Sequence, residues 1–284
     1  MKKIIFSMLS ICVSFAASAF SKVVKEESFH TSTVKNITAS SFGGNYTISK
    51  FNGDSVVVRV SLECKDFTAY NNFMMKYAVN LSSTSGNLNL RTDKVPSSTG
   101  TLVYEIFLPA DIPLDIKSEK SNVSIKDLKV NMKVNIIDGV LFGDNLSGVL
   151  TISTEKMDVD IKGNNLEATI NTKNSDVSFS GKGGKITVIN ASGDSKIKLT
   201  GIVDAADIQS TSGDIDVLLP KSINCNLQAA SLKKSILINF EDILISGNVT
   251  PYNIKVALGK GGTDIKFNTQ GGNLTISNVL MLSK

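Results

Sequence analysis

The sequence predicts an all-β, single-domain protein built as a parallel β-solenoid, similar to a right-handed β-helix. Short segments with apolar residues at positions i and i+2 recur every nine or ten residues from Leu114 onward, a spacing too short for a helix between strands. A turn of the form Ser-Gly-Asp recurs, as the stacking of equivalent corners requires. Proline and aromatic residues are scarce, with 5 prolines and 6% aromatic residues. A β-sandwich is the alternative, since its hairpins produce a similar spacing.

The repeated turn pattern is clearest at Ser212-Gly213-Asp214, which precedes a predicted strand with Ile215 and Val217 on one face. Glycine supplies the unusual backbone angles, aspartate closes the turn through its side chain, and β-branched residues follow at period two. Similar turns lie at residues 174–176 and 192–194. If two segments form one coil, a coil has about nineteen residues and the repeats form roughly eight or nine coils.

The N-terminal residues 1–19 have the pattern of a secretory signal peptide. Lys2 and Lys3 precede an apolar run over residues 4–16, and Ala17-Ser18-Ala19 is a cleavage site. A membrane anchor would need a longer apolar run, of ~20 residues. We therefore expect export to the periplasm, the cell surface or the medium, and no integral membrane segment after cleavage.

The mature chain is expected to begin with an irregular strand region over residues 20–110, followed without a linker by solenoid repeats over residues 111–284. One short helix is predicted near residues 66–79, where Asp66 can cap the helix and Phe67, Tyr70, Phe73, Met74 and Tyr77 form an apolar stripe. Strands are predicted on both sides of the turn at residues 51–54, and at residues 87–91 and 101–108.

The charge and the cysteine content exclude several classes of function. The formal charge is +4, and it falls to about +2 once Lys2 and Lys3 are removed, so we expect no nucleic-acid partner. Cys64 and Cys225 are expected to be buried free thiols, with a disulfide between them as the alternative. The single histidine, His30, is remote in sequence from both, which gives no support to a Cys-His nucleophile or a zinc site.

Four further segments are candidate sites. Two pairs of aspartates, Asp158 with Asp160 and Asp214 with Asp216, each place two carboxylates on one face of a strand. This spacing suits general acid–base catalysis or the binding of a cation. The glycine-rich segments 181–185 and 259–265 resemble phosphate-binding or calcium-binding loops but lack their defining residues. We interpret all four as corners and solvated strand faces, and we predict no catalytic, cofactor-binding or metal-ligating residue and no cofactor.

The segments 102–109 and 113–117, followed by the repeat Ser212–Pro220, resemble the bacterial "putative adhesin" family of repeated β-strand proteins, which is also classed as a domain of unknown function. The resemblance covers residues 36–277. It implies an adhesin-like β-solenoid of the cell envelope or the exterior, and it supplies no catalytic residues.

These observations predict an exported, non-enzymatic β-solenoid that acts as an adhesin or envelope scaffold through an extended polar surface. Its expected partner is a protein or a carbohydrate. A polysaccharide-active enzyme on a β-helix and a periplasmic accessory binding protein are the two alternatives, since β-helices also carry such enzymes and an exposed sheet edge can bind a partner strand.

Overall fold

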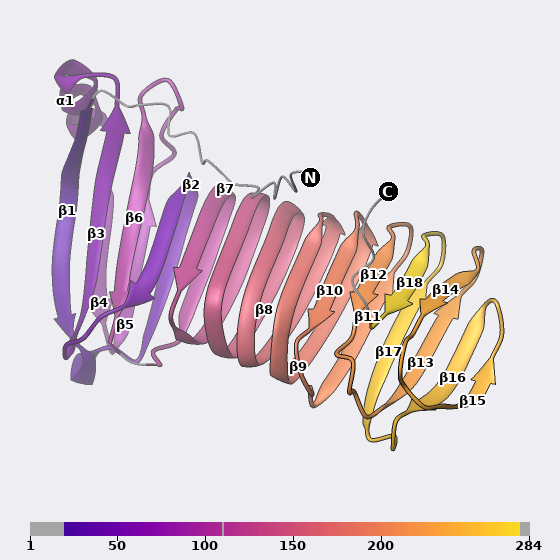
Figure 1. Cartoon of the computed structure of the whole chain (residues 1–284). Coiled ribbons are helices and arrows are strands. Elements are labelled where there is room, and N and C mark those ends of the chain that lie inside the picture. Colours follow the sequence, from indigo (N-terminus) through magenta and orange to yellow (C-terminus); the bar gives the residue numbers. More distant parts are fainter. Residues whose placement is uncertain (1–19, 110, 279–284) are drawn as a thin grey trace, which may run out of the picture.

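Two columns of parallel strands, stacked rung upon rung, form the body of the protein (Figure 1). The computed structural model describes residues 20–109 and 111–278. The predicted signal peptide at residues 1–19 lies outside these described residues. In the described part, one α-helix stands beside 18 strands.

The coil length is set by the pairing of β7 (Leu114–Lys126), β8 (Lys129–Asn174) and β9 (Val177–Ser192). Leu114 lies opposite Met132, and Val159 lies opposite Val177, so each rung repeats eighteen positions later. The next coil is longer, because Ser195 lies opposite Ile215. All these pairs are parallel, whereas a β-sandwich is antiparallel. The predicted solenoid is therefore confirmed, with coils close to the expected length.

The inner faces of the coils form one continuous apolar core. Burial alternates residue by residue along the strands, as expected for a sheet with one wet face. Ile152, Ile170, Val188 and Ile208 are fully buried on successive coils. Apolar side chains at equivalent positions of successive coils stack on one another, so the core runs along the length of the rod.

The N-terminal region consists of the following elements: β1 (Phe20–His30), a 3-10 turn η1 (Thr31–Thr33), β2 (Asn36–Lys50), β3 (Ser55–Cys64), α1 (Phe67–Lys76), β4 (Val79–Thr84), β5 (Asn87–Thr92) and β6 (Thr101–Leu108). The predicted helix is confirmed but ends at Lys76, because Tyr77 is extended. Asp66 caps it by accepting a hydrogen bond from the Ala69 amide, and Tyr70 and Phe73 are buried on its inner face.

The remaining elements complete the rod: β10 (Ser195–Leu199), β11 (Ala205–Ser210), β12 (Ile215–Leu218), β13 (Cys225–Ser231), β14 (Ile236–Asn239), β15 (Ile245–Val249), β16 (Asn253–Leu258), β17 (Thr263–Thr269) and β18 (Leu274–Ser277). At each end of the rod, one coil is out of chain order. The β2 coil lies between the β5/β6 coil and β7. The β17/β18 coil lies between β11/β12 and β13/β14.

The proposed boundary between residues 110 and 111 stays a prediction. β2 pairs in parallel with β5 and β6 on one side and with β7 on the other. The strand region and the repeats therefore share an unbroken ladder of main-chain hydrogen bonds at this point.

The insertion of the C-terminal coil can be tested by engineered disulfides. Lys266 lies opposite both Asp207 and Gln228, on the outer face of the sheet. We expect Asp207→Cys with Lys266→Cys to form a disulfide, since neighbouring strands lie ~4.8 Å apart, within the reach of a disulfide. Asp207→Cys with Gln228→Cys should stay reduced, because β17 separates these strands. Coils stacked in chain order would reverse the two results, which mass spectrometry of linked peptides distinguishes.

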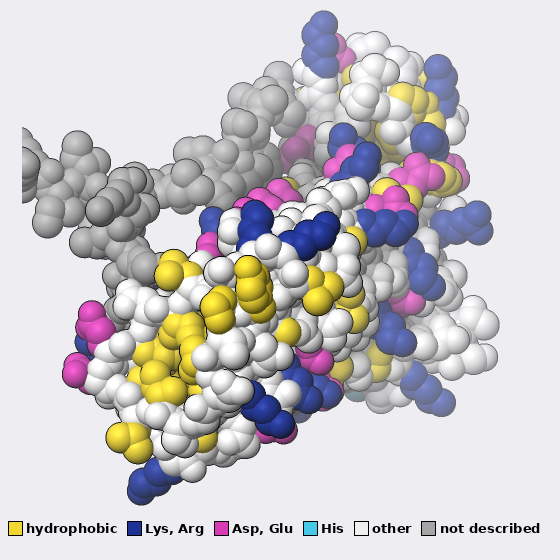
Figure 2. All heavy atoms as spheres, turned by 90° about the vertical axis from the view of Figure 1, so that its right-hand side faces the viewer, with side chains coloured by type: hydrophobic (Ala, Val, Ile, Leu, Met, Phe, Trp, Pro, Cys, Tyr) yellow, Lys and Arg dark blue, Asp and Glu magenta, His cyan; other side chains and the backbone are white. Residues whose placement is uncertain are grey.

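The C-terminal end of the rod has an apolar surface. Figure 2 looks onto this end and shows hydrophobic side chains gathered on it. The exposed residues are Leu232, Leu237, Leu244, Ile245, Val249 and Tyr252. β15 pairs only with β16 among the described strands, and all five of its residues are exposed. The last rung of the solenoid therefore leaves apolar side chains uncovered at this end of the rod.

Candidate functional site

The aspartates of the repeated turns form a column of corner hydrogen bonds. A carboxylate oxygen of Asp158 accepts from the Asp176 amide at 3.0 Å, and Asp176 accepts from the Asp194 amide at 2.8 Å. Asp194 in turn accepts from the Asp214 amide at 3.0 Å. Asp214 accepts from both the main-chain and the side-chain nitrogen of Asn273, at 2.7 and 2.8 Å. These carboxylates thus hold each corner to the next one.

The hydrogen bonds from Asn273 hold the pKa of Asp214 below its usual range. Asp216 lies on the outer face of β12, opposite Lys196 and Thr275, and Asp160 lies opposite Ser178. The four candidate acids are therefore spread along a corner column and along the strand faces. Within the described residues, no group of three or more His, Cys, Asp or Glu side chains could hold a metal ion.

Both glycine-rich segments lie at corners of the solenoid. In the segment 259–265, the Lys260 amide donates to Asn224 Oδ1 at 2.8 Å and the Gly261 amide donates to the Leu258 carbonyl at 3.1 Å. In the segment 181–185, a Cβ atom on Gly184 would overlap the carbonyl oxygen of Leu166 on the coil below. Glycine is needed there because the main chains of adjacent corners approach closely.

Cys64 and Cys225 are both buried and free, as expected. Burial raises the pKa of the Cys225 thiol to about 11 and also raises that of Cys64, so both are poor nucleophiles. Among the described residues, no helix is long and apolar enough to cross a bilayer.

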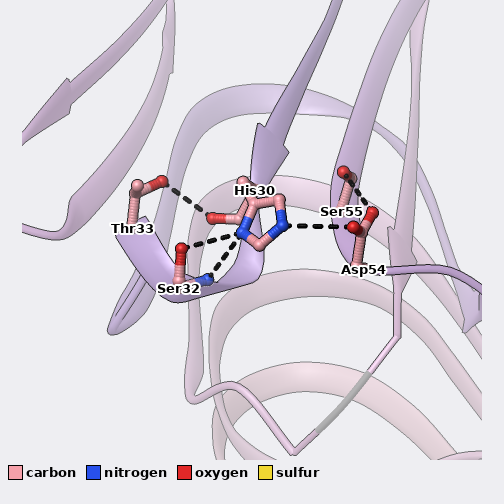
Figure 3. A network of polar contacts seen from close by, with 5 residues as sticks. All are labelled: His30, Ser32, Thr33, Asp54 and Ser55. Carbon is pink, nitrogen blue, oxygen red and sulfur yellow. Dashed lines mark hydrogen bonds and ion pairs between the residues drawn. The ribbon is translucent and has the colours of Figure 1, made fainter.

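His30 belongs to a surface network that joins η1 to the turn between β2 and β3 (Figure 3). Its Nε2 lies 3.1 Å from an oxygen of Asp54, and its Nδ1 lies 2.8 Å from the Ser32 hydroxyl. Nδ1 also accepts from the Ser32 amide at 3.3 Å, so the ring caps the 3-10 turn. The Ser55 hydroxyl and the nearby His30 lower the pKa of Asp54. The order serine, histidine, aspartate resembles a hydrolase triad.

A hollow lined by polar side chains and one phenylalanine lies at the corner of the β2 coil. We call it the corner groove: a hollow of about 420 Å³ lined by Phe42, Gly43, Gly44, Asn45, Asp93, Lys94, Val95, Ser97, Gly100, Thr101, Leu102, Lys120, Ser121 and Asn122. Two stacked corners, at residues 42–45 and 120–122, form one wall. The connection between β5 and β6 forms the other. It is longer than the regular corners and stands over them.

Gly44 lets the corner that borders the groove pack closely against β6. A Cβ atom on Gly44 would lie 2.5 Å from the Leu102 carbonyl oxygen and 2.6 Å from a Tyr104 ring carbon. Gly44 also has a φ of +129°, which other residues rarely adopt. A side chain at this position would therefore strain the corner and collide with Leu102 and Tyr104 of β6.

A buried hydroxyl network stiffens the corner from below. The Tyr46 and Tyr104 rings stack with their centroids 4.4 Å apart. The Tyr46 hydroxyl donates to Ser41 Oγ at 2.9 Å, and Ser41 donates to Ser118 Oγ at 3.1 Å. The Tyr104 and Thr92 hydroxyls lie 2.9 Å apart. Because these buried hydroxyls are hydrogen-bonded directly to one another, they fix the backbone on which the groove is built.

This network predicts a loss of stability at alkaline pH. Burial raises the pKa of Tyr104 to about 12, and burial beside Tyr104 raises that of Tyr46 beyond its usual range. An unfolded tyrosine ionises near pH ~10, so this stabilisation is complete below that pH and is lost as the pH rises through the folded values. We expect two of the five tyrosines to ionise only on unfolding. Tyrosinate absorbance and circular dichroism, followed together against pH, check this. Ionisation of all five near pH ~10 with intact dichroism would contradict it.

The sequence did not reveal the corner groove. The sequence features that belong to the groove are the paired glycines at positions 43 and 44, the aromatic residue beside them, and a connection between two predicted strands that is longer than the corners of the repeats. None of these specifies that residues 42–45 and 93–101 meet, because that depends on the out-of-order position of the β2 coil.

The fold and the groove define a β-solenoid protein with stacked polar corners and one hollowed corner. The chain belongs to the Toastrack DUF4097 family, whose model matches residues 32–277. The expected family resemblance is thereby confirmed. No curated protein matches the sequence.

Several solved structures are similar to the chain at low sequence identity. A "putative adhesin" from Bacteroides fragilis is 14% identical, with 91% of this chain and 97% of that chain covered and a TM-score of 0.48. A "putative cell adhesion protein" from Clostridium sporogenes is 15% identical, with 90% and 99% covered and a TM-score of 0.25. A "putative lipid binding protein" from Parabacteroides distasonis is 13% identical, with 90% and 96% covered and a TM-score of 0.36. At these scores the likeness assigns no ligand to this chain.

Proposed function

We propose that the mature chain is an exported, non-enzymatic binding protein that acts by surface contact, as an adhesin or an envelope scaffold. The observation that carries this proposal is the corner groove, a concave site that combines an exposed aromatic ring with amide side chains on a rigid floor. Export rests on the signal-peptide pattern of residues 1–19.

The outer faces of the rod support the same function. They carry serine, threonine, asparagine and lysine, and their charges are often paired along the ladder, as between Lys173 and Glu155 on adjacent coils. Such a flat, rigid, polar surface suits many weak contacts at once, and multivalent contact raises the overall strength of binding. The partner class is a protein or a carbohydrate.

The test is binding of the purified chain 20–284 to immobilised glycans, matrix proteins and whole cells. Saturable binding to at least one of these is expected, and it should survive substitution of the solvent-facing Asp160 and Asp216 by asparagine. Absence of binding to all three surfaces would overturn the proposal. Crosslinking in the native envelope followed by pull-down identifies the partner.

A hydrolase is the second candidate, because Ser32, His30 and Asp54 are arranged in the order of a triad. The three side chains lie on an exposed surface and do not line the corner groove. A triad acts with an oxyanion hole and a substrate pocket. Hydrolysis of p-nitrophenyl acetate decides the matter: a rate above that of free imidazole, lost in Ser32→Ala, would support the enzyme and count against our proposal.

A further inference from the structure

We infer that the corner groove binds a neutral saccharide of about two sugar rings, with Phe42 as the stacking surface and the amides of Asn45 and Asn122 as the hydrogen-bonding groups. This inference rests on the proposed function and names the ligand class of its site. The volume of about 420 Å³ falls in the ~300–1,000 Å³ range of small-molecule sites.

Phe42 provides an apolar face that the core does not use. Its side chain is 44% exposed at the rim of the groove. An aromatic ring offers a flat surface for the C–H face of a pyranose, which a purely polar groove cannot offer. Lys94 Nζ lies 5.5 Å from the ring centroid, but the Lys94 side chain is 71% exposed, so a ligand can displace it at little cost.

Asn45 and Asn122 lie opposite each other on adjacent rungs of the parallel ladder between β2 and β7. The Asn122 amide nitrogen donates to Asn45 Oδ1 at 3.1 Å. An asparagine side chain has two N–H donors and a carbonyl with two lone pairs, so most of this pair's hydrogen-bonding capacity stays free. Two adjacent planar amides suit neighbouring hydroxyl groups, each of which both donates and accepts.

The charges around the groove favour a neutral ligand. Lys94 lies 3.7 Å from Glu119, and Lys120 lies 3.8 Å from Asp138. Asp93 also lines the groove, where it accepts a hydrogen bond from the Ala78 amide at 2.9 Å. Since each lysine has a carboxylate beside it, the groove presents no excess positive charge for an acidic sugar.

The floor of the groove is already fixed before a ligand arrives. The corner backbone is held by the tyrosine–hydroxyl network and by glycines with no room for a side chain. A preformed site loses little conformational entropy on binding, which matters for a ligand with few apolar atoms.

The test is NMR titration of ¹⁵N-labelled chain 20–284 with N,N′-diacetylchitobiose, cellobiose and lactose, and with digalacturonic acid as the acidic probe. At least one neutral probe should shift the amide signals of Gly43, Gly44, Asn45 and Asn122. Phe42→Ala should weaken that binding by about tenfold, and Asn45→Ala or Asn122→Ala by about fivefold.

Phe51→Ala is the matched control, because Phe51 is a similarly exposed phenylalanine, 37% exposed, that directly follows the C-terminal end of β2. It should leave the binding unchanged, and an unchanged amide spectrum outside the groove shows that each variant is folded. No shift with any neutral probe, shifts with the acidic probe alone, or equal binding by Phe42→Ala would each overturn the inference. If no neutral probe binds but the wild-type chain still binds cells or matrix proteins, the inferred ligand class is wrong and the proposed function stands.

Discussion

Replacing Gly213 with alanine lowers the free energy of unfolding by about 3 kcal/mol or more. Gly213 stacks directly on Gly193, and a Cβ atom at position 213 would overlap the Gly193 carbonyl oxygen. Gly272 on the next coil stacks on Gly213 in the same way. The neighbour in each case is main chain, which cannot move aside without breaking the ladder on both sides. The corner must therefore open or the coils must separate.

Gly271→Ala is the control for this substitution, because a Cβ atom at position 271 would lie 3.2 Å from the Thr211 carbonyl oxygen, a contact that small shifts relieve. Urea unfolding followed by circular dichroism measures both variants. Equal midpoints for Gly213→Ala and Gly271→Ala would show that the corners do not stack as closely as the structure has them.

Asn190→Ala is expected to destabilise the protein by about 3 kcal/mol, because Asn190 is a buried polar side chain with all its bonds inside the corner. Its amide nitrogen donates to the carbonyl oxygens of Ser175 and Gly193, each at 2.9 Å. Its Oδ1 accepts from the Thr172 hydroxyl at 2.7 Å. Alanine leaves these groups without partners in the dry interior, where an unmade hydrogen bond is costly.

Asn268→Ala provides the comparison, since Asn268 is exposed on β17. Its replacement should change the free energy of unfolding by less than about 0.5 kcal/mol. Asn190→Asp is a second informative variant, because it keeps the shape but removes both N–H donors. A stability of Asn190→Ala close to that of Asn268→Ala would contradict the assigned role of the buried asparagine.

The periodic part of the fold was predictable because it depends on local chemistry. The coils repeat one sequence pattern: a turn closed by aspartate is followed by apolar residues at every second position, as at Ser212–Val217. Stacking like corners satisfies the turn aspartates and buries the apolar residues together, and the structure confirms this register. The short helix followed from a cap at Asp66 and an apolar stripe, although its last turn was predicted too long.

The order of the coils could not be read from the sequence. Every rung has the same pattern of buried and exposed positions. β17 could therefore pair with the edge of almost any other rung and still bury the same side chains. The choice is made by tertiary packing at the ends of the rod. For the same reason the corner groove, which needs β2 beside β6 and β7, was outside the reach of pattern analysis.

The central claim is that the carboxylates of the repeats are structural or solvated, and that contact with a partner occurs at the corner groove. The most direct measurement compares binding of three chains to the glycans or cells that bind the mature protein: wild type, Phe42→Ala, and the double variant Asp160→Asn with Asp216→Asn. We predict that Phe42→Ala loses about tenfold in affinity while the double variant matches wild type. Loss of binding in the double variant, with Phe42→Ala unchanged, would contradict the account.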